Sequence, residues 1–353
     1  MGQLAVVGGG VIGLACAWRL AAAGHAVRLI DPEPGRGASW VAGGMLAPVT
    51  ESWPGEEAAL ELGSAALERW PSFAEELGVG LLGAGTLVLA VDPADAAVLA
   101  ALAGYLAGRG REVERISGRA ARRLEPCLGP RVRSGLSVPG DLAVDNRELI
   151  GALLRACAAG GVRFLTAPAT AVRPGVVELS DPAPEAPDKS TVECDAVVVA
   201  AGARSRDLHP ALSGFVRPVK GEILRLRARP GVLPPPTRTV RALVSGRPVY
   251  LVPRGDGSLV LGATQHEVGY DTEVTAGGVR DLIADAEVVL PGVGEYALVE
   301  SAAGLRAGSP DNVPKVGWLE PGVIAATGHH RNGLLLAPTT ADAVLELVRE
   351  GVR

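Results

Sequence analysis

Residues 4–31 read LAVVGGGVIGLACAWRLAAAGHAVRLID, and this stretch decides the fold. An apolar run at 4–7 leads into three glycines, a helical stretch extends to Gly24, and a second apolar run at 26–30 ends in Asp31. This order predicts a strand, a glycine turn, a helix and a second strand that ends in an acid. It is the complete dinucleotide-binding fingerprint, in the structural context that the motif requires.

Three glycines of this motif occupy positions where a Cβ atom would collide. Gly8 allows the tight turn after the first strand, Gly10 lets the backbone approach a pyrophosphate, and Gly13 lets the helix lie close to the strand. The helix N-terminus offers free N–H groups to phosphates. Asp31 can accept hydrogen bonds from an adenosine ribose. A glycine-rich turn without any ligand is the alternative that this stretch alone leaves open.

The composition is that of a globular chain with more than one domain. Of the residues, 48% are hydrophobic and 21% are charged, as in globular proteins. The chain has 353 residues, which is more than a single hydrophobic core usually includes, so two domains are expected. Asp92, Pro93 and Asp95 interrupt the most apolar region before it could span a bilayer, which predicts a soluble protein. The net charge of -5 and the 3% of aromatic residues argue against a nucleic-acid partner. Because the first predicted strand starts at Leu4, no leader is expected, and a cytoplasmic location follows.

The cysteines and histidines show no ligand spacing. They are Cys16, Cys127, Cys157 and Cys194, and His25, His209, His266, His329 and His330. Since no C-x-x-C or H-x-x-x-H pattern is present, no metal is expected. We interpret the cysteines as small buried hydrophobes.

Beyond the fingerprint, the first half of the chain combines a loop with several helices. The segment 32–48 is too rich in glycine and proline to be a helix or a central strand throughout, so we expect a loop that comes close to another part of the molecule or to a ligand. Helical spacing at 55–78 is interrupted by Pro71. A further helix is expected at 145–160, with Asn146 as its cap.

Two later segments return to the nucleotide-binding sheet. The run 194–205 is continuously apolar up to a glycine turn, as in a strand buried on both faces of a parallel sheet. Residues 322–328 form a similar run before the last helix. Between them, residues 219–262 show the pattern of an antiparallel meander. We therefore expect two domains that are interleaved along the chain.

The C-terminal strand and its glycine turn favour a flavin over a nicotinamide. An NAD-linked dehydrogenase could share the first motif, but it has no need for a second strand and turn directed at the cofactor. A reduced isoalloxazine carries negative charge near N1 and O2, which N–H groups at the start of the last helix would stabilise. No cysteine lies between Ala303 and Pro338, where some amine oxidases carry a covalent link, so we expect noncovalent FAD.

Several segments together resemble one known family. They are residues 8–13 with Asp31, 38–46, 219–222, 250–254, 261–264, 303–306 with 309–311, and 328–338. Over its full length the chain resembles the D-amino-acid-oxidase-like FAD-dependent oxidoreductases, and among them the glycine oxidases of thiamine biosynthesis. It departs from the family pattern at His330, where these oxidases usually have an aromatic residue, and Gln265 stands where pocket-lining residues vary.

The resemblance implies an α/β fold with a Rossmann-like FAD-binding domain on a parallel sheet. Residues 1–80, 145–215 and 300–353 would form this discontinuous domain. Residues 81–144 and 216–299 would form a smaller, interleaved α+β domain that binds the substrate on a mostly antiparallel sheet.

The resemblance also implies which residues contact FAD. These are Gly8, Gly10, Val11, Ile12, Gly13, Asp31, Pro32, Ala38, Ser39, Gly43, Gly44, Met45, Ala169, His329, His330, Arg331, Asn332, Gly333, Leu334 and Leu335.

On the substrate side, three residues are candidates for catalysis. Arg306 follows an expected strand end, and its guanidinium could hold a carboxylate through two parallel hydrogen bonds, as the matching arginine does in the family. Tyr250 could donate its hydroxyl to the same carboxylate. Arg331 could polarise the substrate or contact the cofactor. The alternatives are a surface arginine, a packed tyrosine and a structural arginine.

His329 and His330 are not expected to act as a catalytic base. When the substrate amine is neutral, the α-hydrogen can leave as hydride directly to flavin N5, and the pocket only has to orient the substrate. We therefore expect a backbone or packing role for both histidines.

The activity that the resemblance implies is the oxidation of glycine, and of other small amines or D-amino acids, to the imino acid. Dioxygen would reoxidise the flavin and give hydrogen peroxide. The imino acid would supply the thiazole of thiamine, so thiazole-synthesis proteins are implied partners, and a homotetramer is the implied assembly. Two alternatives stay open: a sarcosine or D-amino-acid oxidase or dehydrogenase of the same family, and a flavin-binding protein without turnover.

Overall fold

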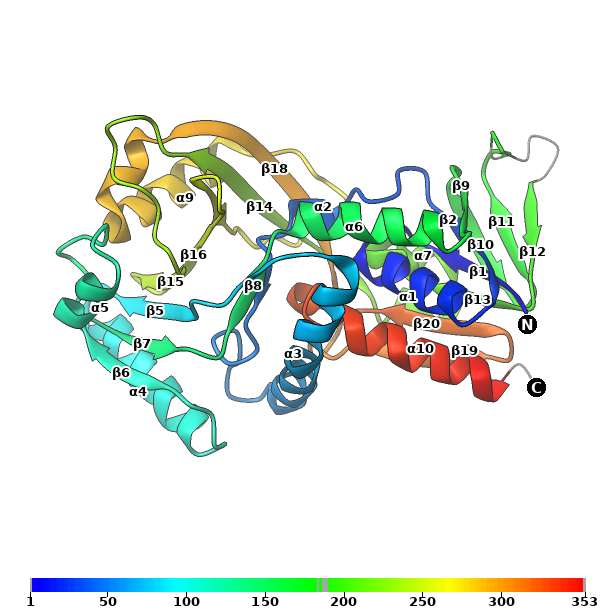
Figure 1. Ribbon diagram of the computed structural model, residues 1–353, viewed down its shortest axis with the longest axis horizontal. Coiled ribbons are helices and arrows are strands. Elements are labelled where there is room, and N and C mark those ends of the chain that lie inside the picture. The colour runs from blue at the N-terminus through cyan, green and yellow to red at the C-terminus, as the bar shows by residue number, and fades with distance from the viewer. Residues whose placement is uncertain (1, 183, 186–189, 352–353) are drawn as a thin grey trace.

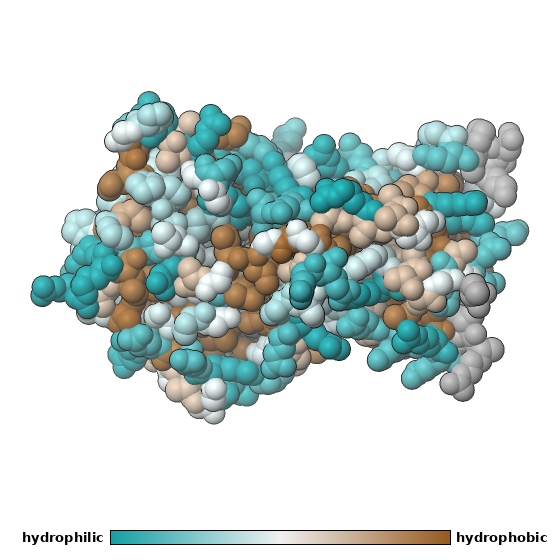
Figure 2. Space-filling model, in the orientation of Figure 1, coloured by the Kyte–Doolittle hydropathy of each residue, from teal (hydrophilic) through white to brown (hydrophobic). Residues whose placement is uncertain are grey.

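The computed structural model describes residues 2–182, 184–185 and 190–351. The molecule is elongated, with a lobe around each of two large sheets and both chain ends at the same end of the molecule (Figure 1). On the face shown in Figure 2, hydrophilic side chains cover most of the surface, and apolar ones gather toward the middle.

The first lobe is built on a six-stranded sheet. Its strands, in spatial order, are β19 (Lys315–Glu320), β20 (Val323–Thr327), β13 (Ala196–Val199), β1 (Gln3–Val7), β2 (Ala26–Ile30) and β9 (Arg163–Leu165). All neighbours pair in parallel except β19, which is antiparallel to β20. The fingerprint strand β1 is central, and strands from the middle and the end of the chain lie beyond it, as the sequence predicts.

Four helices build the core around this sheet. They are α1 (Val11–Ala22), α3 (Glu57–Leu77), α6 (Asn146–Ala159) and α10 (Ala337–Gly351). Leu14 of α1, Leu153 of α6 and Val344 of α10 are fully buried in one apolar cluster with Val6 and Val198 of the strands. This burial of apolar area supplies the main driving force for the lobe.

The second lobe is built on an eight-stranded sheet. In spatial order its strands are β18 (Ala297–Gly308), β14 (Arg217–Arg227), β17 (Ser258–Gly262), β16 (Arg247–Pro253), β15 (Thr239–Val244), β5 (Thr86–Ala90), β7 (Ser134–Val138) and β6 (Glu114–Ser117). The neighbours are antiparallel except for β15 and β5. Residue 300, the predicted domain boundary, lies inside β18, which pairs with β14.

Both faces of this second sheet are covered at β5, and that strand is apolar on both sides. Leu87 and Leu89 of β5 pack in a cluster with α9 (Ala276–Val289) and α5 (Gly118–Leu124). Val88 and Ala90 of the same strand pack with α4 (Pro93–Ala107). Successive residues of β5 face opposite sides of the sheet because side chains alternate with a period of two along a strand.

Short elements complete the fold. Two small sheets are formed by β3 (Met45–Leu46), β8 (Leu142–Val144) and β4 (Leu81–Leu82), and by β10 (Ala169–Arg173), β11 (Val176–Leu179) and β12 (Thr191–Glu193). The short helices are α2 (Ala38–Val41), η1 (Gly202–Arg204), α7 (Ser205–Leu208), α8 (Pro210–Ser213), η2 (Pro291–Glu295) and η3 (His330–Asn332).

The predicted fold class is confirmed, but two local predictions are wrong. α3 continues through Pro71, because fully buried Trp70 and Phe73 on either side anchor the helix, and the Trp70 indole donates to the Leu335 carbonyl at 2.9 Å. Asp145, not Asn146, caps α6, since its carboxylate accepts from the N–H of Arg147 at 2.9 Å.

Two features are absent from the described residues. None of their helices has the length and apolar character for crossing a membrane. In the same residues, no three histidine, cysteine, aspartate or glutamate side chains are grouped so that they could hold a metal ion.

Gly13 and Gly104 both lie within helices, but only Gly13 has crowded surroundings. A Cβ at Gly13 would overlap the carbonyl oxygen of Gly8, whereas a Cβ at Gly104 would meet nothing within 4 Å. We expect Gly13→Ala to lower the free energy of unfolding by about 1–3 kcal/mol through overpacking. Gly104→Ala, the matched control, should raise it by about 0.5–1 kcal/mol. Urea denaturation of both variants measures the difference, and equal effects would contradict the close approach of helix and turn.

Candidate functional site

The glycine turn between β1 and α1 has the geometry of a phosphate-binding turn. Gly8 has φ +110°, and a Cβ there would overlap the carbonyl oxygen of Ala200 on the neighbouring strand end. A Cβ on Gly10 would have only the Ser39 hydroxyl close by, at 3.1 Å. The Asp31 carboxylate accepts from the Gly9 N–H at 2.7 Å, which places the acid directly beside the turn. These are the features that an adenosine diphosphate group requires.

A cleft extends from this turn into the space between the two sheets. It is lined by Val11, Ala38, Ser39, Val41, Ala42, Gly43, Gly44, Met45, Glu51, Gly221, Ile223, Arg241, Pro248, Val249, Tyr250, Ala263, Thr264, Gln265, Gly304, Arg306, His330, Arg331, Gly333 and Leu334. One wall therefore comes from the loop after the fingerprint, another from the large antiparallel sheet, and a third from the turn before α10. The small side chains on the walls leave room for a flat ring system.

The structure brings together most of the residues that the sequence singled out. Val11, Ala38, Ser39, Gly43, Gly44, Met45, Tyr250, Arg306, His330, Arg331, Gly333 and Leu334 line this one cleft. Gly8, Gly10, Ile12, Gly13, Asp31, Pro32, Ala169, His329, Asn332 and Leu335 lie outside its lining. Of this second group, Ala169 packs against an apolar cluster that contains Val7 and Ile30, the last residues of β1 and β2.

Arg306 presents a guanidinium without an acidic partner. It lies on β18, opposite Val219 of β14, and its planar head covers Gly221, where a Cβ would overlap it. Its Nη1 donates a hydrogen bond to the Thr264 carbonyl at 3.3 Å. Within the described residues no carboxylate lies within ion-pair distance of it. A half-buried guanidinium in this state is suited to bind an anion.

The Tyr250 ring stands next to this guanidinium, between two glycines. A Cβ on Gly43 would lie 2.9 Å from the ring, and one on Gly262 would overlap the hydroxyl. Burial raises the pKa of the Tyr250 hydroxyl, and the nearby positive charge of Arg306 opposes part of that rise. The hydroxyl is therefore protonated at neutral pH and can donate a hydrogen bond.

Arg331 has an acidic partner, in contrast to Arg306. Its Nη2 forms an ion pair with Glu56 and donates to the Glu51 carbonyl at 2.8 Å. The guanidinium thus ties the 51–56 segment to the turn before α10. Its free hydrogen-bonding capacity toward a substrate is correspondingly small.

Glu51, Arg241 and Gly221 are cleft residues that the sequence did not single out as site residues. Arg241 lies opposite Tyr250 on the paired strand, and its Nη1 is 2.5 Å from Glu51 Oε1. Gly221 lies within a segment that resembles the family, which is a usable sequence signal. The pairing of Arg241 with Glu51 depends on strand register and leaves no signal in the sequence.

Both histidines near the cleft are held uncharged. His329 is buried and its Nε2 lies 3.0 Å from the Thr340 hydroxyl. Burial lowers its pKa to about 3. His330 has φ +49°, and its pKa is lowered to about 3 by burial and by the charges of Arg331, Arg306 and Arg217. Uncharged, buried imidazoles fit the packing role that we expect for them.

Lys220 and Glu222 hold the loop that follows β17. The Lys220 ammonium donates to Asp271 at 2.7 Å, and this contact raises the Lys220 pKa. Glu222 accepts from the Thr275 N–H at 2.8 Å and from the Thr264 hydroxyl at 3.1 Å. The position of Thr264 in the cleft wall is therefore determined by buried polar contacts on β14.

The family comparison agrees with this geometry. Residues 3–347 match the family model described as FAD dependent oxidoreductase. The chain belongs to this family. The predicted cofactor, FAD, and the predicted enzyme class are thereby confirmed, and the glycine turn with its adjacent acid fits the adenosine diphosphate part of FAD. The contacts of individual residues with FAD stay predictions.

Individual relatives point to one branch of the family. The crystal structure of glycine oxidase from Geobacillus kaustophilus matches with a TM-score of 0.88 and 31% identity, covering 99% of this chain and 95% of that one. The putative thiamine biosynthesis oxidoreductase ThiO of Rhizobium etli is 33% identical over 97% of this chain and 95% of its own length. The bifunctional protein ThiO/ThiG of Synechocystis is 33% identical over 97% of this chain, which spans about half, 51%, of that relative's length.

The low pKa values of His329 and His330 predict a pH-dependent stability. The folded chain keeps both rings neutral to about pH 3, whereas the unfolded chain protonates them near 6.5. Stability should therefore fall as the pH decreases from 6.5 toward 3, by roughly 1.4 kcal/mol per pH unit for each ring. Denaturation between pH 4.5 and 7 should show a weaker slope for His330→Gln than for the unchanged chain. NMR resonances of both imidazoles that titrate near pH 6.5 would contradict this account.

Proposed function

We propose that this chain oxidises glycine to the imino acid, with FAD as the cofactor and dioxygen as the final electron acceptor. The observation that carries the proposal is the Arg306 guanidinium, which lines the cleft beside the protonated hydroxyl of Tyr250 and has no acidic partner in the part of the chain that the structure describes. The names of the glycine oxidase and ThiO relatives support the same substrate.

In this proposal the side chains of the cleft bind and orient the substrate. Arg306 receives the carboxylate in two parallel hydrogen bonds, and Tyr250 donates a third. FAD, when bound, supplies the hydride acceptor and returns the electrons to dioxygen. Catalysis then depends on orientation, because no ionised base is required when the amine is neutral.

The remaining site residues have supporting roles in the proposal. The residues that the sequence assigns to FAD form the turn, the 38–45 loop and the 329–335 turn around it. Arg331 holds the 51–56 segment at the cleft through Glu56 and the Glu51 carbonyl, so the proposal leaves the carboxylate to Arg306. His329 and His330 stay neutral and pack the turn before α10.

We further propose that the imino acid supplies thiazole formation in thiamine biosynthesis. The Rhizobium etli relative is named for thiamine biosynthesis, and the Synechocystis relative combines ThiO with a second protein, ThiG. A cytoplasmic location suits this role, and the four free thiols are typical of a reducing compartment. The homotetramer and the division into 1–80, 145–215 and 300–353 against 81–144 and 216–299 also stay predictions.

Anaerobic mixing of the FAD-loaded protein with glycine should bleach the flavin absorbance. The rate should increase as the pH rises toward the pKa of the glycine amine, because only the neutral amine has the lone pair that forms the imine. Air should then restore the absorbance and release peroxide. Bleaching without recovery in air would indicate a dehydrogenase with another acceptor. No bleaching by glycine, sarcosine or small D-amino acids would refute the amino-acid substrate.

Arg306→Ala should weaken the binding of the transition state and leave the binding of the cofactor unchanged. Loss of the charged partner of a buried carboxylate costs about 2–5 kcal/mol, which is roughly 30-fold to several thousand-fold in kcat/KM. Gly221→Ala should act in the same direction, because its Cβ displaces the Arg306 head without removing it. The flavin spectrum should stay unchanged in both variants.

Arg229→Ala is the control for Arg306→Ala. Arg229 pairs with Glu295 at 2.6 Å on the exposed surface of the same lobe, so its loss should leave kcat/KM unchanged. Near-normal turnover of glycine by a folded, FAD-loaded Arg306→Ala variant would show that Arg306 does not bind the substrate.

A further inference from the structure

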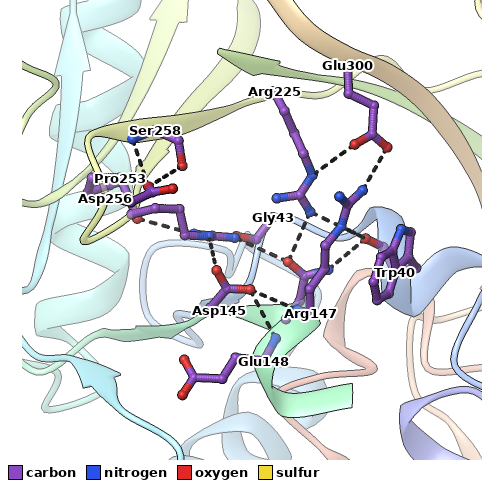
Figure 3. Close-up of polar contacts among 12 residues, drawn as sticks. Trp40, Gly43, Asp145, Arg147, Glu148, Arg225, Pro253, Asp256, Ser258 and Glu300 are labelled. Atoms are coloured by element: carbon purple, nitrogen blue, oxygen red, sulfur yellow. Dashed lines mark hydrogen bonds and ion pairs between the residues drawn. The ribbon is translucent and has the colours of Figure 1, made fainter. Parts of the chain in front are cut away.

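A buried polar cluster connects the two lobes behind the loop that lines the cleft (Figure 3). Its donors are Asn146 and Arg147 at the start of α6, Arg225 on β14 and Arg254 just after β16. We call these four residues the loop latch. No part of the proposed substrate chemistry uses them.

The loop latch holds backbone carbonyls of the cleft-lining loop 38–45, whose first four residues form the short helix α2. The Asn146 amide donates to the carbonyls of Ser39 and Trp40, both at 2.8 Å. Arg254 Nη2 donates to the Gly43 carbonyl at 2.8 Å. Three carbonyls of one loop are therefore bound by side chains that come from other parts of the chain.

Asn146 is the centre of the loop latch. Its side chain is fully buried, and its Oδ1 accepts from Arg225 and Arg254, both at 3.2 Å. With the oxygen bound by two guanidinium groups and the nitrogen by two carbonyls, only one orientation of the amide satisfies all partners. The loop, the helix start and the second lobe are thus fixed relative to one another.

The charges of the cluster show that it is costly to bury. Arg147 pairs with Glu300 at 2.7 Å and Arg254 with Asp145 at 3.2 Å, so three guanidinium groups face two carboxylates. Burial and the charges of Arg147 and Arg254 lower the pKa of Arg225 to about 10. Burying an excess positive charge does not by itself favour folding. The cluster is better explained by the geometry that it imposes on the loop.

We propose that Asn146, Arg225 and Arg254 are positioning residues that keep the 38–45 loop in the shape that binds FAD. Gly43 and Gly44 give this loop conformational freedom, and Gly44 already has φ +88°. A carbonyl that turned into the cleft would place partial negative charge and bulk where the cofactor binds. By holding these carbonyls, the loop latch pre-organises the site before FAD arrives.

Asn146→Asp separates this role from a general role in stability. The carboxylate keeps the oxygen that accepts from Arg225 and Arg254, balances the excess positive charge and suits the first turn of α6. It loses both donors to the carbonyls of Ser39 and Trp40 and repels them instead. We expect the apoprotein Tm to stay within about 2 °C of the unchanged chain, while the Kd for FAD rises about tenfold or more.

A second variant and a matched control complete the test. Arg254→Met removes the donor to the Gly43 carbonyl and leaves two guanidinium groups facing two carboxylates, so it should also raise the Kd for FAD. Arg122→Ala is the control, since Arg122 likewise donates to a backbone carbonyl, that of Val132 at 2.9 Å, but lies on α5 in the second lobe. Its Kd for FAD should stay unchanged.

The measurement is the titration of each apoprotein with FAD, followed by quenching of the flavin fluorescence, together with the apoprotein Tm. A raised Kd at an unchanged Tm in either latch variant supports the proposal. An unchanged Kd in both variants overturns it. A raised Kd that occurs only with a matching loss of Tm also overturns it, because the cluster would then only stabilise the fold. Since no substrate is added, the result is independent of whether glycine is oxidised.

Discussion

The contact of α1 with the turn that precedes it is the constraint on which the rest of the structure depends. With no Cβ on Gly13, the helix backbone comes against the Gly8 carbonyl, and with none on Gly8, the turn passes the end of β13. β1 is paired on both sides, and α1 packs in one core with α6 and α10. A displacement of α1 would therefore move the helix N-terminus, the cleft wall at Val11 and both neighbouring helices together.

The three arginines that line the cleft differ in their charge partners. Arg331 and Arg241 both line it, but each is neutralised by a glutamate of the 51–56 segment. Among the described residues, the one hydrogen-bond partner of the Arg306 guanidinium is the Thr264 carbonyl. A guanidinium that is already paired gains little from a further anion, whereas an unpaired one gains two charge-assisted hydrogen bonds. This difference is why the proposed function assigns the substrate carboxylate to Arg306.

The cleft also explains why the two lobes are interleaved along the chain. Its floor comes from the fingerprint helix, while Tyr250 and Arg306 come from the antiparallel sheet. The 38–45 loop belongs to the first lobe by sequence, yet Arg225 and Arg254 of the second lobe bind its backbone (Figure 3). Neither lobe contains a complete site. The polar contacts between the lobes fix the position of the 38–45 loop relative to the second lobe, because a hydrogen bond tolerates little displacement.

The sequence by itself determined the nucleotide turn, the parallel order of the sheet around it and the candidate anchor. These features depend on local rules: glycine where a Cβ would collide, apolar runs in buried strands and an acid at a strand end. Two predictions from the sequence were wrong. The helix continues through Pro71 because Trp70 and Phe73 are packed in the core, and α6 is capped by Asp145 because its carboxylate, and not the side chain of the adjacent Asn146, meets the free N–H groups. Only the tertiary structure decided which arginines are paired and that Asn146 binds the loop. Those contacts join residues 106 to 280 positions apart, and no local pattern encodes which distant partner a long side chain will meet.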